Sequence, residues 1–463
     1  MKGKAAAGIA VLALCACGGG GEGMPEGPRS FRVAVTAGDV GSSTVRLPFS
    51  LVGLPYTVRI DAQPAGEFAE GWVAVRAEPG DVLSVTTPDP ADSIRSNVRL
   101  HGGAAGDVVV TVAKAYGDTR IWVEDAGFVP GPASGSACGN DVDDDGDGRT
   151  DYPDDPGCAY SNDQSESGGS HAVGMTGVLY FANPRIADVQ GLSSVPSLVG
   201  RAVTIDEGDL VVVGVMVDAL VVTDVSETRG YNSLLAYNYN TPAGIRVCDK
   251  LDALSGIVGE FYGLTELGFP SWIRDPDWPR PELPSGPAEC PVPEPTELVA
   301  TVLDDAIQLE SLESSLVQVT GGVVTARFED CDAVENGGNG NGSIDFDTPE
   351  EVCADDCSTA LDCTELTSFD RYGQFGLATP PEPGTGEQRK VLVVARGAAP
   401  DFDVRANAGA TLPLVRGILS EVSFLDQRVV ELRCRDDLVV EGSPKPMWEA
   451  CVSPPEDDEG YTR

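Results

Sequence analysis

Short hydrophobic runs that alternate with polar residues recur along most of this 463-residue chain. In the first quarter, the runs at 31–35, 108–112 and 120–123 are rich in valine, isoleucine and aromatic residues. Glycine, proline and aspartate, which favour turns, separate them. Short strands at such intervals are typical of β-sandwiches. We therefore expect residues 30–126 to form a β-sandwich.

The same pattern returns twice further along the chain. The segment 174–300 contains a predicted strand pair at 210–222, a run at 234–239 and a longer run at 254–267. The segment 312–451 contains runs at 316–324, 391–394 and 409–419, and a cysteine-rich insertion occupies about residues 329–370. Period-two alternation with turn residues between the runs predicts a mainly β fold throughout.

Two motifs in the segment 174–300 carry a resemblance to a known family. They are Ile-Ala-Asp-Val-Gln-Gly at 186–191 and Gly-Ile-Val-Gly-Glu-Phe-Tyr-Gly-Leu-Thr-Glu-Leu at 256–267. Their order resembles the small OB-type barrel that precedes the catalytic domain in bacterial extracellular nucleases, over roughly residues 183–272. The run at 316–324 is similar to the opening strand of the next barrel in such proteins. The resemblance implies two OB-like β-barrels, at 174–300 and 312–451.

The catalytic part of that family is not recognisable in this chain. The family uses metal-binding carboxylates with paired histidines, whereas this sequence contains two histidines, His101 and His171. No G-x-x-x-x-G-K-[ST] loop, G-x-S-x-G elbow or H-E-x-x-H helix is present either. The resemblance therefore implies the barrels and not the catalysis. We expect no nuclease activity and favour a non-catalytic role, and the enzyme question stays open.

The N-terminus has the features of an export signal. Lys2 and Lys4 precede an apolar run at 5–14, which is too short to span a bilayer. The junction Leu-Cys-Ala-Cys at 14–17 resembles a bacterial lipoprotein signal, which implies cleavage of residues 1–16, acylation of Cys17 and a flexible tether at 17–29. The alternative is an ordinary secretory signal with chance cysteines. We expect a lipid-anchored protein of the bacterial cell envelope, in the outer membrane, on its periplasmic face or at the cell surface.

The net charge of −42 limits the classes of partner that the chain can bind. The chain has 73 acidic and 31 basic residues, and the segment 201–272 of the first expected barrel has ten acidic and four basic residues. This charge opposes the approach of a phosphate backbone, so nucleic acid is not an expected partner. The 41% hydrophobic content still allows packed cores.

An acidic segment between two cysteines, residues 138–158, contains eight aspartates. From residue 143 its spacing is D-x-D-x-D-G-x-x-D-x-x-D, which brings many oxygen ligands to one point, as Ca²⁺ requires. The expected ligands are the carboxylates of Asp143, Asp145, Asp147, Asp151 and Asp154 and the backbone carbonyl of Arg149. The segment resembles a thrombospondin type 3-like calcium loop, which we expect to link the sandwich to the barrels. The alternative is a solvated acidic linker.

A second, poorer loop pattern lies in the cysteine-rich insertion. Asn339, Asn341, Asp345 and Asp347 could hold a cation, but most early ligands are neutral and no glutamate closes the loop. Its composition favours a flexible glycine loop over a metal site.

Besides Cys15 and Cys17, ten of the 12 cysteines remain for disulfides, as an even count in an exported protein favours. Their clustering suggests the pairs Cys138–Cys158, Cys248–Cys290 and Cys434–Cys451. Two more disulfides, in one of three connectivities, would join Cys331, Cys353, Cys357 and Cys363. A four-thiolate zinc site is the competing interpretation of that quartet.

Tyr237 and Tyr239 alternate with Asn238 and Asn240 in the first expected barrel. In a strand, both tyrosines would share one face and both asparagines the other. OB barrels bind oligonucleotides and oligosaccharides on such a face. The alternative, which the usual role of strand aromatics favours, is that the tyrosines pack the barrel.

These observations together predict a calcium-stabilised modular envelope protein with a non-catalytic binding or scaffold role. Its partner would be a polysaccharide or an envelope protein. The alternative is an accessory protein of an extracellular hydrolase or nuclease that uses the barrels to hold a polymer.

Overall fold

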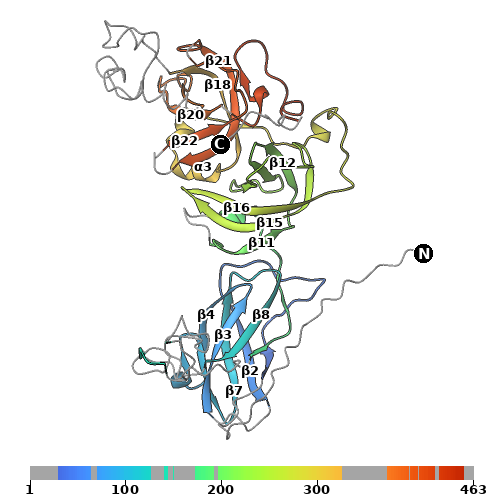
Figure 1. Ribbon diagram of the computed structural model, residues 1–463, viewed down its shortest axis with the longest axis vertical. Helices are drawn as coiled ribbons and strands as arrows, with labels where there is room; N and C mark the ends of the chain where they lie inside the picture. Colours follow the sequence, from blue (N-terminus) through green and yellow to red (C-terminus); the bar gives the residue numbers. More distant parts are fainter. Residues whose placement is uncertain are drawn as a thin grey trace, which may run out of the picture. The chain divides into compact units, whose positions relative to one another are not determined.

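The structure is a computed structural model that describes residues 30–63, 70–126, 140–143, 150, 173–191, 197–325, 373–395, 397–404, 406–422 and 427–452. It is mainly β, as the alternating pattern predicts (Figure 1). The chain divides into two compact units. Unit 1 comprises Met1–Val40 and Val52–Leu179, and unit 2 comprises the rest, including residues 41–51.

Unit 1 is built on one ten-stranded sheet, with the central order β1-β2-β7-β6-β3-β8-β10. Along β2 and β7, alternate side chains such as Val58, Ile60, Val108 and Val110 are buried. The same alternation on β3 and β8 supplies the opposing apolar layer of the expected sandwich. The strands of the sheet are β1 (Ser30–Ala37), β2 (Leu54–Gln63), β3 (Glu70–Glu78), β4 (Asp81–Thr86), β5 (Ser93–Ile94), β6 (Asn97–His101), β7 (Ala104–Ala113), β8 (Asp118–Asp125), β9 (Val173–Met175) and β10 (Leu179–Tyr180).

The sandwich extends beyond the expected end at residue 126. Strand β9 pairs with β8 in antiparallel register, with Val123 opposite Gly174 and Trp122 opposite Met175. In the sequence, the acidic segment 138–158 therefore lies between two strands that pair with each other. After β9, unit 2 resumes at Tyr180.

Barrel 1, formed by strands β11 to β16 of unit 2, is closed. Strands β12, β13 and β14 form an antiparallel meander, β14 pairs with β16 in parallel, and β15 pairs with both β16 and β12. This strand order is that of an OB-type barrel. The strands are β11 (Ala202–Ile205), β12 (Leu210–Val215), β13 (Ala219–Asp224), β14 (Ser233–Tyr237), β15 (Lys250–Phe261) and β16 (Leu264–Arg274).

Barrel 2, formed by strands β17 to β23, repeats this topology. Strand β18 pairs with β19, β19 with β20, β20 in parallel with β22, and β21 closes the barrel between β22 and β18. The cysteine-rich insertion falls between β18 and β19, mostly outside the described residues. The strands are β17 (Thr296–Glu297), β18 (Leu316–Val324), β19 (Gln374–Ala378), β20 (Lys390–Val394), β21 (Thr411–Val422), β22 (Gln427–Glu431) and β23 (Leu438–Val439).

The two barrels pack against each other through an apolar cluster, here called the barrel interface. Most of its members lie on the outer face of β12, β13 and β14, and barrel 2 contributes Leu316 and Ile418. A guanidinium N–H of Arg433 in barrel 2 also donates to the carbonyl of Val213 in barrel 1, over 2.7 Å. Barrel 2 thus covers most of the outer face of β12–β14 in barrel 1. The members from barrel 1 are Val211, Val213, Met216, Ala219, Val221, Leu235 and Leu264.

Two of the disulfides suggested by the cysteine clustering are present, Cys248–Cys290 and Cys434–Cys451. Each lies beside a buried aspartate that pairs with two arginines. Asp249 pairs with Arg246 and Arg280, and Asp437 pairs with Arg416 and Arg433. The remaining predicted pairs lie outside the described residues.

Three short helices interrupt the strands that the sequence pattern predicted. They are α1 (Ile186–Gln190), α2 (Ala300–Leu303) and α3 (Ala306–Ser311). Residues 41–51 belong to unit 2 although they lie between β1 and β2 in the sequence, which the hydrophobic pattern did not predict. There, the N–H of Leu47 donates to the carbonyl of Tyr180 over 2.8 Å, and the carbonyl of Leu47 accepts from the N–H of Ala182 over 2.7 Å. Within the described ranges, no helix is long and apolar enough to cross a bilayer.

Candidate functional site

The Tyr237–Asn240 segment departs from the expected continuous strand. Strand β14 ends at Tyr237, and Tyr239 has a left-handed backbone with φ of 62°. Despite this break, the rings of Tyr237 and Tyr239 meet edge to face, with centroids 4.5 Å apart. Tyr237 packs against the barrel interface, whereas Tyr239 is 49% exposed. The packing interpretation therefore holds for the first tyrosine and not for the second.

Phe269 joins these tyrosines, and the sequence analysis missed it. It lies in a β-bulge of β16, where the register shifts between the pairs Ser255–Ser271 and Ile257–Gly268. Its φ is 51°, its side chain is 72% exposed, and its ring centroid lies 5.5 Å from that of Tyr239. The Gly-Phe-Pro break at 268–270 in an otherwise alternating strand was the available signal. We call Tyr237, Tyr239 and Phe269 the aromatic platform.

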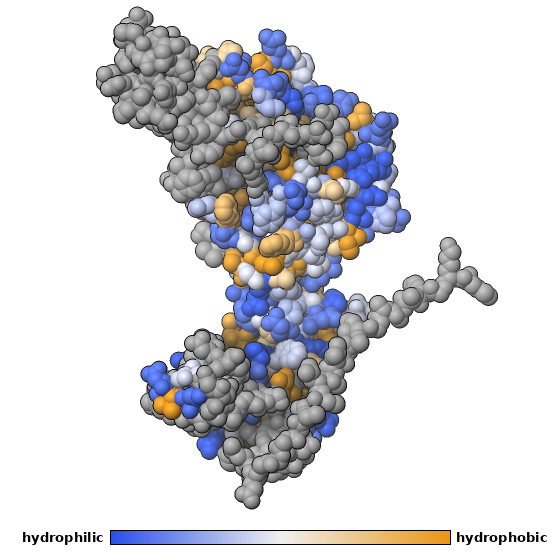
Figure 2. Space-filling model, in the orientation of Figure 1, coloured by the Kyte–Doolittle hydropathy of each residue, from blue (hydrophilic) through white to orange (hydrophobic). Residues whose placement is uncertain are grey.

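The bulge depends on a close approach of the two strands of the β15–β16 hairpin. A Cβ at Gly256 would lie 3.0 Å from the carbonyl oxygen of Gly268 and 3.0 Å from Cβ of Leu267. Glycine at 256 therefore lets the bulge form and directs Phe269 outward, as bulges do when they re-aim a side chain. Figure 2 shows apolar side chains exposed over this part of unit 2, where β15 and β16 lie in Figure 1.

The asparagines hold the turn that follows β14. The side-chain amide of Asn238 donates to the carbonyl of Asn240 over 3.0 Å, and its backbone N–H donates to the carbonyl of Asp218 over 2.7 Å. Asn240 is exposed. The turn fixes Tyr239 beside the loop between β12 and β13, where Asp218 lies.

Three carboxylates from the two barrels affect one another through their charges, namely Asp218, Glu266 and Glu431. Glu266 on β16 is in register with Leu235, and Glu431 on β22 is in register with Ile418, so both face the barrel interface. Burial, and then the charge of Asp218, raise the pKa of Glu266, and the same two causes raise the pKa of Glu431 to about 7. Asp218 is thus electrostatically coupled to both glutamates. Among the described residues, neither glutamate side chain has a hydrogen-bond or ion-pair partner.

Glu313 is a further perturbed carboxylate, with a structural role. It is buried, and its Oε1 accepts from the backbone N–H of Thr265 over 2.9 Å. Burial raises its pKa to about 7, against the effect of that hydrogen bond. It ties the chain before β18 to strand β16 and does not reach the aromatic platform through any contact in the described residues.

The expected calcium loop is described only in part. Asn140 accepts from the backbone N–H of Val142 through its side-chain oxygen over 2.8 Å, and Asp143 follows this small turn. The other expected ligands, Asp145, Asp147, Arg149, Asp151 and Asp154, lie outside the described residues, as do Cys17, the Cys138–Cys158 pair, the Asn339–Asp347 loop and the quartet Cys331, Cys353, Cys357 and Cys363.

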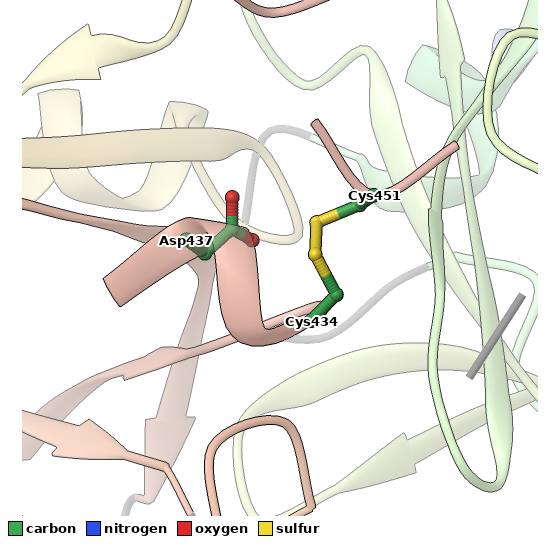
Figure 3. A group of neighbouring side chains, drawn as sticks. All are labelled: Cys434, Asp437 and Cys451. Atoms are coloured by element: carbon green, nitrogen blue, oxygen red, sulfur yellow. A yellow bond between two sulfur atoms is a disulfide. The ribbon is translucent and has the colours of Figure 1, made fainter. Parts of the chain in front are cut away.

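One group in the described residues has metal-type ligand atoms close together, namely Cys434, Asp437 and Cys451 (Figure 3). The two sulfurs are bonded to each other at 2.07 Å, so neither is a thiolate. The Asp437 carboxylate is engaged by Arg416 and Arg433, with contacts of 2.9 and 2.7 Å. A metal ligand must be deprotonated and free, so this group is structural.

No family model, curated protein or solved structure matches the chain.

Proposed function

We propose that this chain is a lipid-anchored, calcium-stabilised, non-catalytic binding protein of the bacterial cell envelope, and that barrel 1 holds a polysaccharide at the aromatic platform. The observation that carries the proposal is that two exposed aromatic residues with left-handed backbone, Tyr239 and Phe269, lie side by side, with ring centroids 5.5 Å apart. Such backbone costs of order 1 to 3 kcal/mol per residue, and exposed aromatic rings gain nothing from the core. Strain of this kind is typically retained where a side chain must face a ligand.

The chemistry of the platform suits sugars. Rings that lie edge to face offer flat apolar surfaces for the C–H faces of pyranose rings, and the side chain of Asn240 and the carboxylates of Asp218 and Glu266 can hydrogen-bond hydroxyl groups. OB-type barrels bind oligosaccharides as well as oligonucleotides. The carboxylates beside the rings oppose a phosphate backbone, so polysaccharide is the better candidate.

The anchor and the calcium site rest on the sequence. Acylation of Cys17 would place the chain on a membrane, because acyl chains supply the binding energy. Calcium at the 138–158 loop would relieve repulsion among eight aspartates. Since β8 and β9 pair on either side of that loop, a bound ion would stabilise the sandwich.

The calcium part is tested on unit 1. We expect wild type to bind Ca²⁺ in a calorimetric titration, and the chain carrying Asp145→Ala and Asp147→Ala to bind it at least tenfold more weakly. Protease sensitivity near residues 140–155 should fall with Ca²⁺ in wild type alone. No heat of binding, together with equal cleavage in calcium and in chelator, would leave an acidic linker in place of the site.

The polysaccharide part is tested by affinity electrophoresis of the mature chain against soluble bacterial surface polysaccharides. We expect Tyr239→Ala and Phe269→Gly each to weaken retardation about tenfold, in line with the contribution of one stacked ring. Phe261→Ala is the matched control, because Phe261 is a 57%-exposed aromatic of the same hairpin that pairs with Tyr262 instead. If no polysaccharide retards wild type, or if the control weakens binding equally, the proposal is wrong.

The charge-coupled carboxylates favour a second candidate function, participation in polymer hydrolysis. Glycoside hydrolysis uses one carboxyl group with a raised pKa as acid and a second, ionised one. Glu431, with its pKa raised to about 7, would fill the first role. Release of new reducing ends from a bound polysaccharide, lost in Glu431→Gln, would establish this function; retained polymer length after prolonged incubation would exclude it.

A further inference from the structure

We propose that the polysaccharide held at the aromatic platform is an uncharged, extended chain, and that it continues from Phe269 across the outer face of β16, β15 and β11. The inference rests on the proposed binding function and names the ligand class and its path. The three strands lie side by side in barrel 1, because β15 pairs with both β11 and β16 (Figure 1). We call the outer face of three adjacent segments, residues 202–205, 253–257 and 268–273, the neutral strip.

The composition of the neutral strip is unusual for this chain. None of the residues in its three segments is charged, whereas 22% of the residues of the whole chain are charged and its net charge is −42. A partner held by ion pairs would find no counterpart on these segments. A second copy of the chain would be repelled by the net charge that both copies carry. The strip therefore favours an uncharged polymer as its occupant.

A row of three hydroxyl groups crosses the neutral strip. Thr204 pairs with Ser255 in the β11–β15 register, and Ser255 pairs with Ser271 in the β15–β16 register, so the three side chains share one face. The next residues along, Ile205 and Leu254, are fully buried, so the hydroxyls lie on the outer face. Thr204 Oγ1 and Ser255 Oγ are hydrogen-bonded over 2.9 Å. Ser271 is exposed, and within the described residues its hydroxyl has no hydrogen-bond partner.

Apolar side chains flank the hydroxyl row on both sides. Ile257, two residues beyond Ser255 on β15, is 43% exposed, and Ile273, two residues beyond Ser271 on β16, is 60% exposed. The two strands run in opposite directions, so these isoleucines lie on opposite sides of the row. Exposed apolar side chains that gather on one face commonly mark a binding site. A band of hydroxyls between two apolar bands matches sugar rings, whose apolar C–H faces are rimmed by hydroxyl groups.

The neutral strip is continuous with the aromatic platform. Phe269 lies two residues before Ser271 on β16, and its ring centroid is 5.5 Å from that of Tyr239. Neighbouring strands are about 4.8 Å apart, so the hydroxyl row extends the platform by roughly 10 Å across the sheet. An extended chain that stacks on Phe269 can therefore contact the row with its next sugar units. Phe261 lies opposite Leu264 at the other end of the β15–β16 hairpin, so this path does not include it.

The test is affinity electrophoresis of the mature chain in gels that contain hydroxyethyl cellulose, an uncharged and extended β-1,4-linked glucan. We expect wild type to be retarded equally at low and high salt, because ion pairs do not contribute. Ser271→Asp should weaken retardation at least about tenfold, since the ligand would take a carboxylate out of water. Thr411→Asp adds the same charge at an exposed hydroxyl residue of β21 in barrel 2, and it should bind like wild type.

A second variant tests the far end of the path with little risk to the fold. Thr204→Val replaces a hydroxyl on β11 by a methyl group in a side chain of the same shape, and valine is well suited to a strand. It should weaken retardation about threefold, as the loss of one hydrogen bond would. Thr86→Val, at an exposed position of β4 in unit 1, is the matched control and should leave retardation unchanged.

The outcomes separate this inference from the proposed function. Loss of binding in Phe269→Gly, with full binding in Ser271→Asp and Thr204→Val, would overturn the path and keep the platform. Stronger retardation by carboxymethyl cellulose, the charged form of the same backbone, would overturn the uncharged class. No retardation by hydroxyethyl cellulose would overturn the inference, while gels with bacterial surface polysaccharides decide the proposed function independently. A wild-type dimer in sedimentation that Ser271→Asp dissociates would assign the strip to a second copy and overturn the inference.

Discussion

The two barrels of unit 2 share one strand order but differ in what covers their outer faces. In barrel 1, the face of β12–β14 that serves OB-type barrels for binding is largely packed against barrel 2. Only its edge, with Tyr239 and Phe269, remains exposed. Barrel 2 carries the long insertion between β18 and β19 where barrel 1 has a tight turn, closed by Met216 N–H donating to the carbonyl of Ala219. A shared topology thus does not locate a shared site, because packing decides which part of the face is available.

The barrels resemble each other most where they are buried. Each has a disulfide next to an aspartate held between two arginines, Asp249 in barrel 1 and Asp437 in barrel 2. In each barrel, the aspartate and its two arginines hold the loop beside the disulfide. We expect these ion clusters to contribute most to the free energy of unfolding. The differences at the surface should dominate binding.

Replacing Asp437 should have the largest effect on stability. Asp437→Ala leaves the guanidinium groups of Arg416 and Arg433 buried without their carboxylate, so we expect a loss of about 3 to 5 kcal/mol in the free energy of unfolding. The measurement is denaturant unfolding followed by circular dichroism. Asp401→Asn, which removes an exposed pair with Arg435, is the control and should cost less than about 1 kcal/mol. Equal losses would mean that the buried cluster is not a principal support of barrel 2.

The disulfides should rank by the length of chain that they close. Cys248–Cys290 spans 42 residues and Cys434–Cys451 spans 17. Chain entropy alone predicts losses of about 4 and about 3 kcal/mol when each pair is replaced by serines. Thermal unfolding of the two variants checks this order. The reverse order would indicate that contacts in the native state outweigh loop closure.

The Glu431 carboxyl should make stability depend on pH. Its folded-state pKa is raised from an ordinary 4.5 to about 7, so the unfolded chain loses the proton first. Wild-type stability should therefore decline between pH 4.5 and about 7, and remain lower above that range. Glu431→Gln should be about 3 kcal/mol more stable than wild type above pH 7 and equal to it below pH 4.5. Denaturant unfolding of both chains below pH 4.5 and above pH 7 measures this difference in stability. If the variant is equally more stable than wild type below pH 4.5, ionisation of Glu431 is not the cause.

Replacing Phe269 should have the smallest effect on the free energy of unfolding and a large effect on polysaccharide affinity. Phe269→Gly relieves a left-handed backbone, so we expect a gain of up to about 1 kcal/mol in stability even though the ring is lost. The same variant should lose polysaccharide affinity. Phe375→Leu, in the core of barrel 2, supplies the opposite pattern, with lower stability and unchanged affinity. A large loss of stability in Phe269→Gly would show that the ring supports the fold.

The alternating pattern was enough to predict the mainly β fold and the sandwich, and the two barrels were predicted from the resemblance of their motifs. Strand β18 was expected at 316–324 and lies at Leu316–Val324. The barrel interface was not predicted, although every residue of β12 and β13 is buried. Such continuous apolar runs indicate a strand that is buried on both faces. Here the inner face lies in the core of barrel 1, and the outer face packs against barrel 2.

The candidate site was half predicted, because Tyr237 and Tyr239 are close in sequence, whereas Phe269 reaches them only through the parallel pairing of β14 and β16. The coupling of Glu266 and Glu431 to Asp218 depends on the packing of two barrels, which residue spacing does not encode. The insertion of the acidic loop between β8 and β9 depends likewise on pairing across a long connection.

Hydrogen exchange with and without a bound polysaccharide tests most directly whether barrel 1 carries the site. The account predicts that ligand protects the backbone amides of residues 237–241 and 266–271 and leaves β19 and β20 of barrel 2 unchanged. Protection confined to β19, β20 and the insertion that precedes them would contradict it and assign binding to barrel 2.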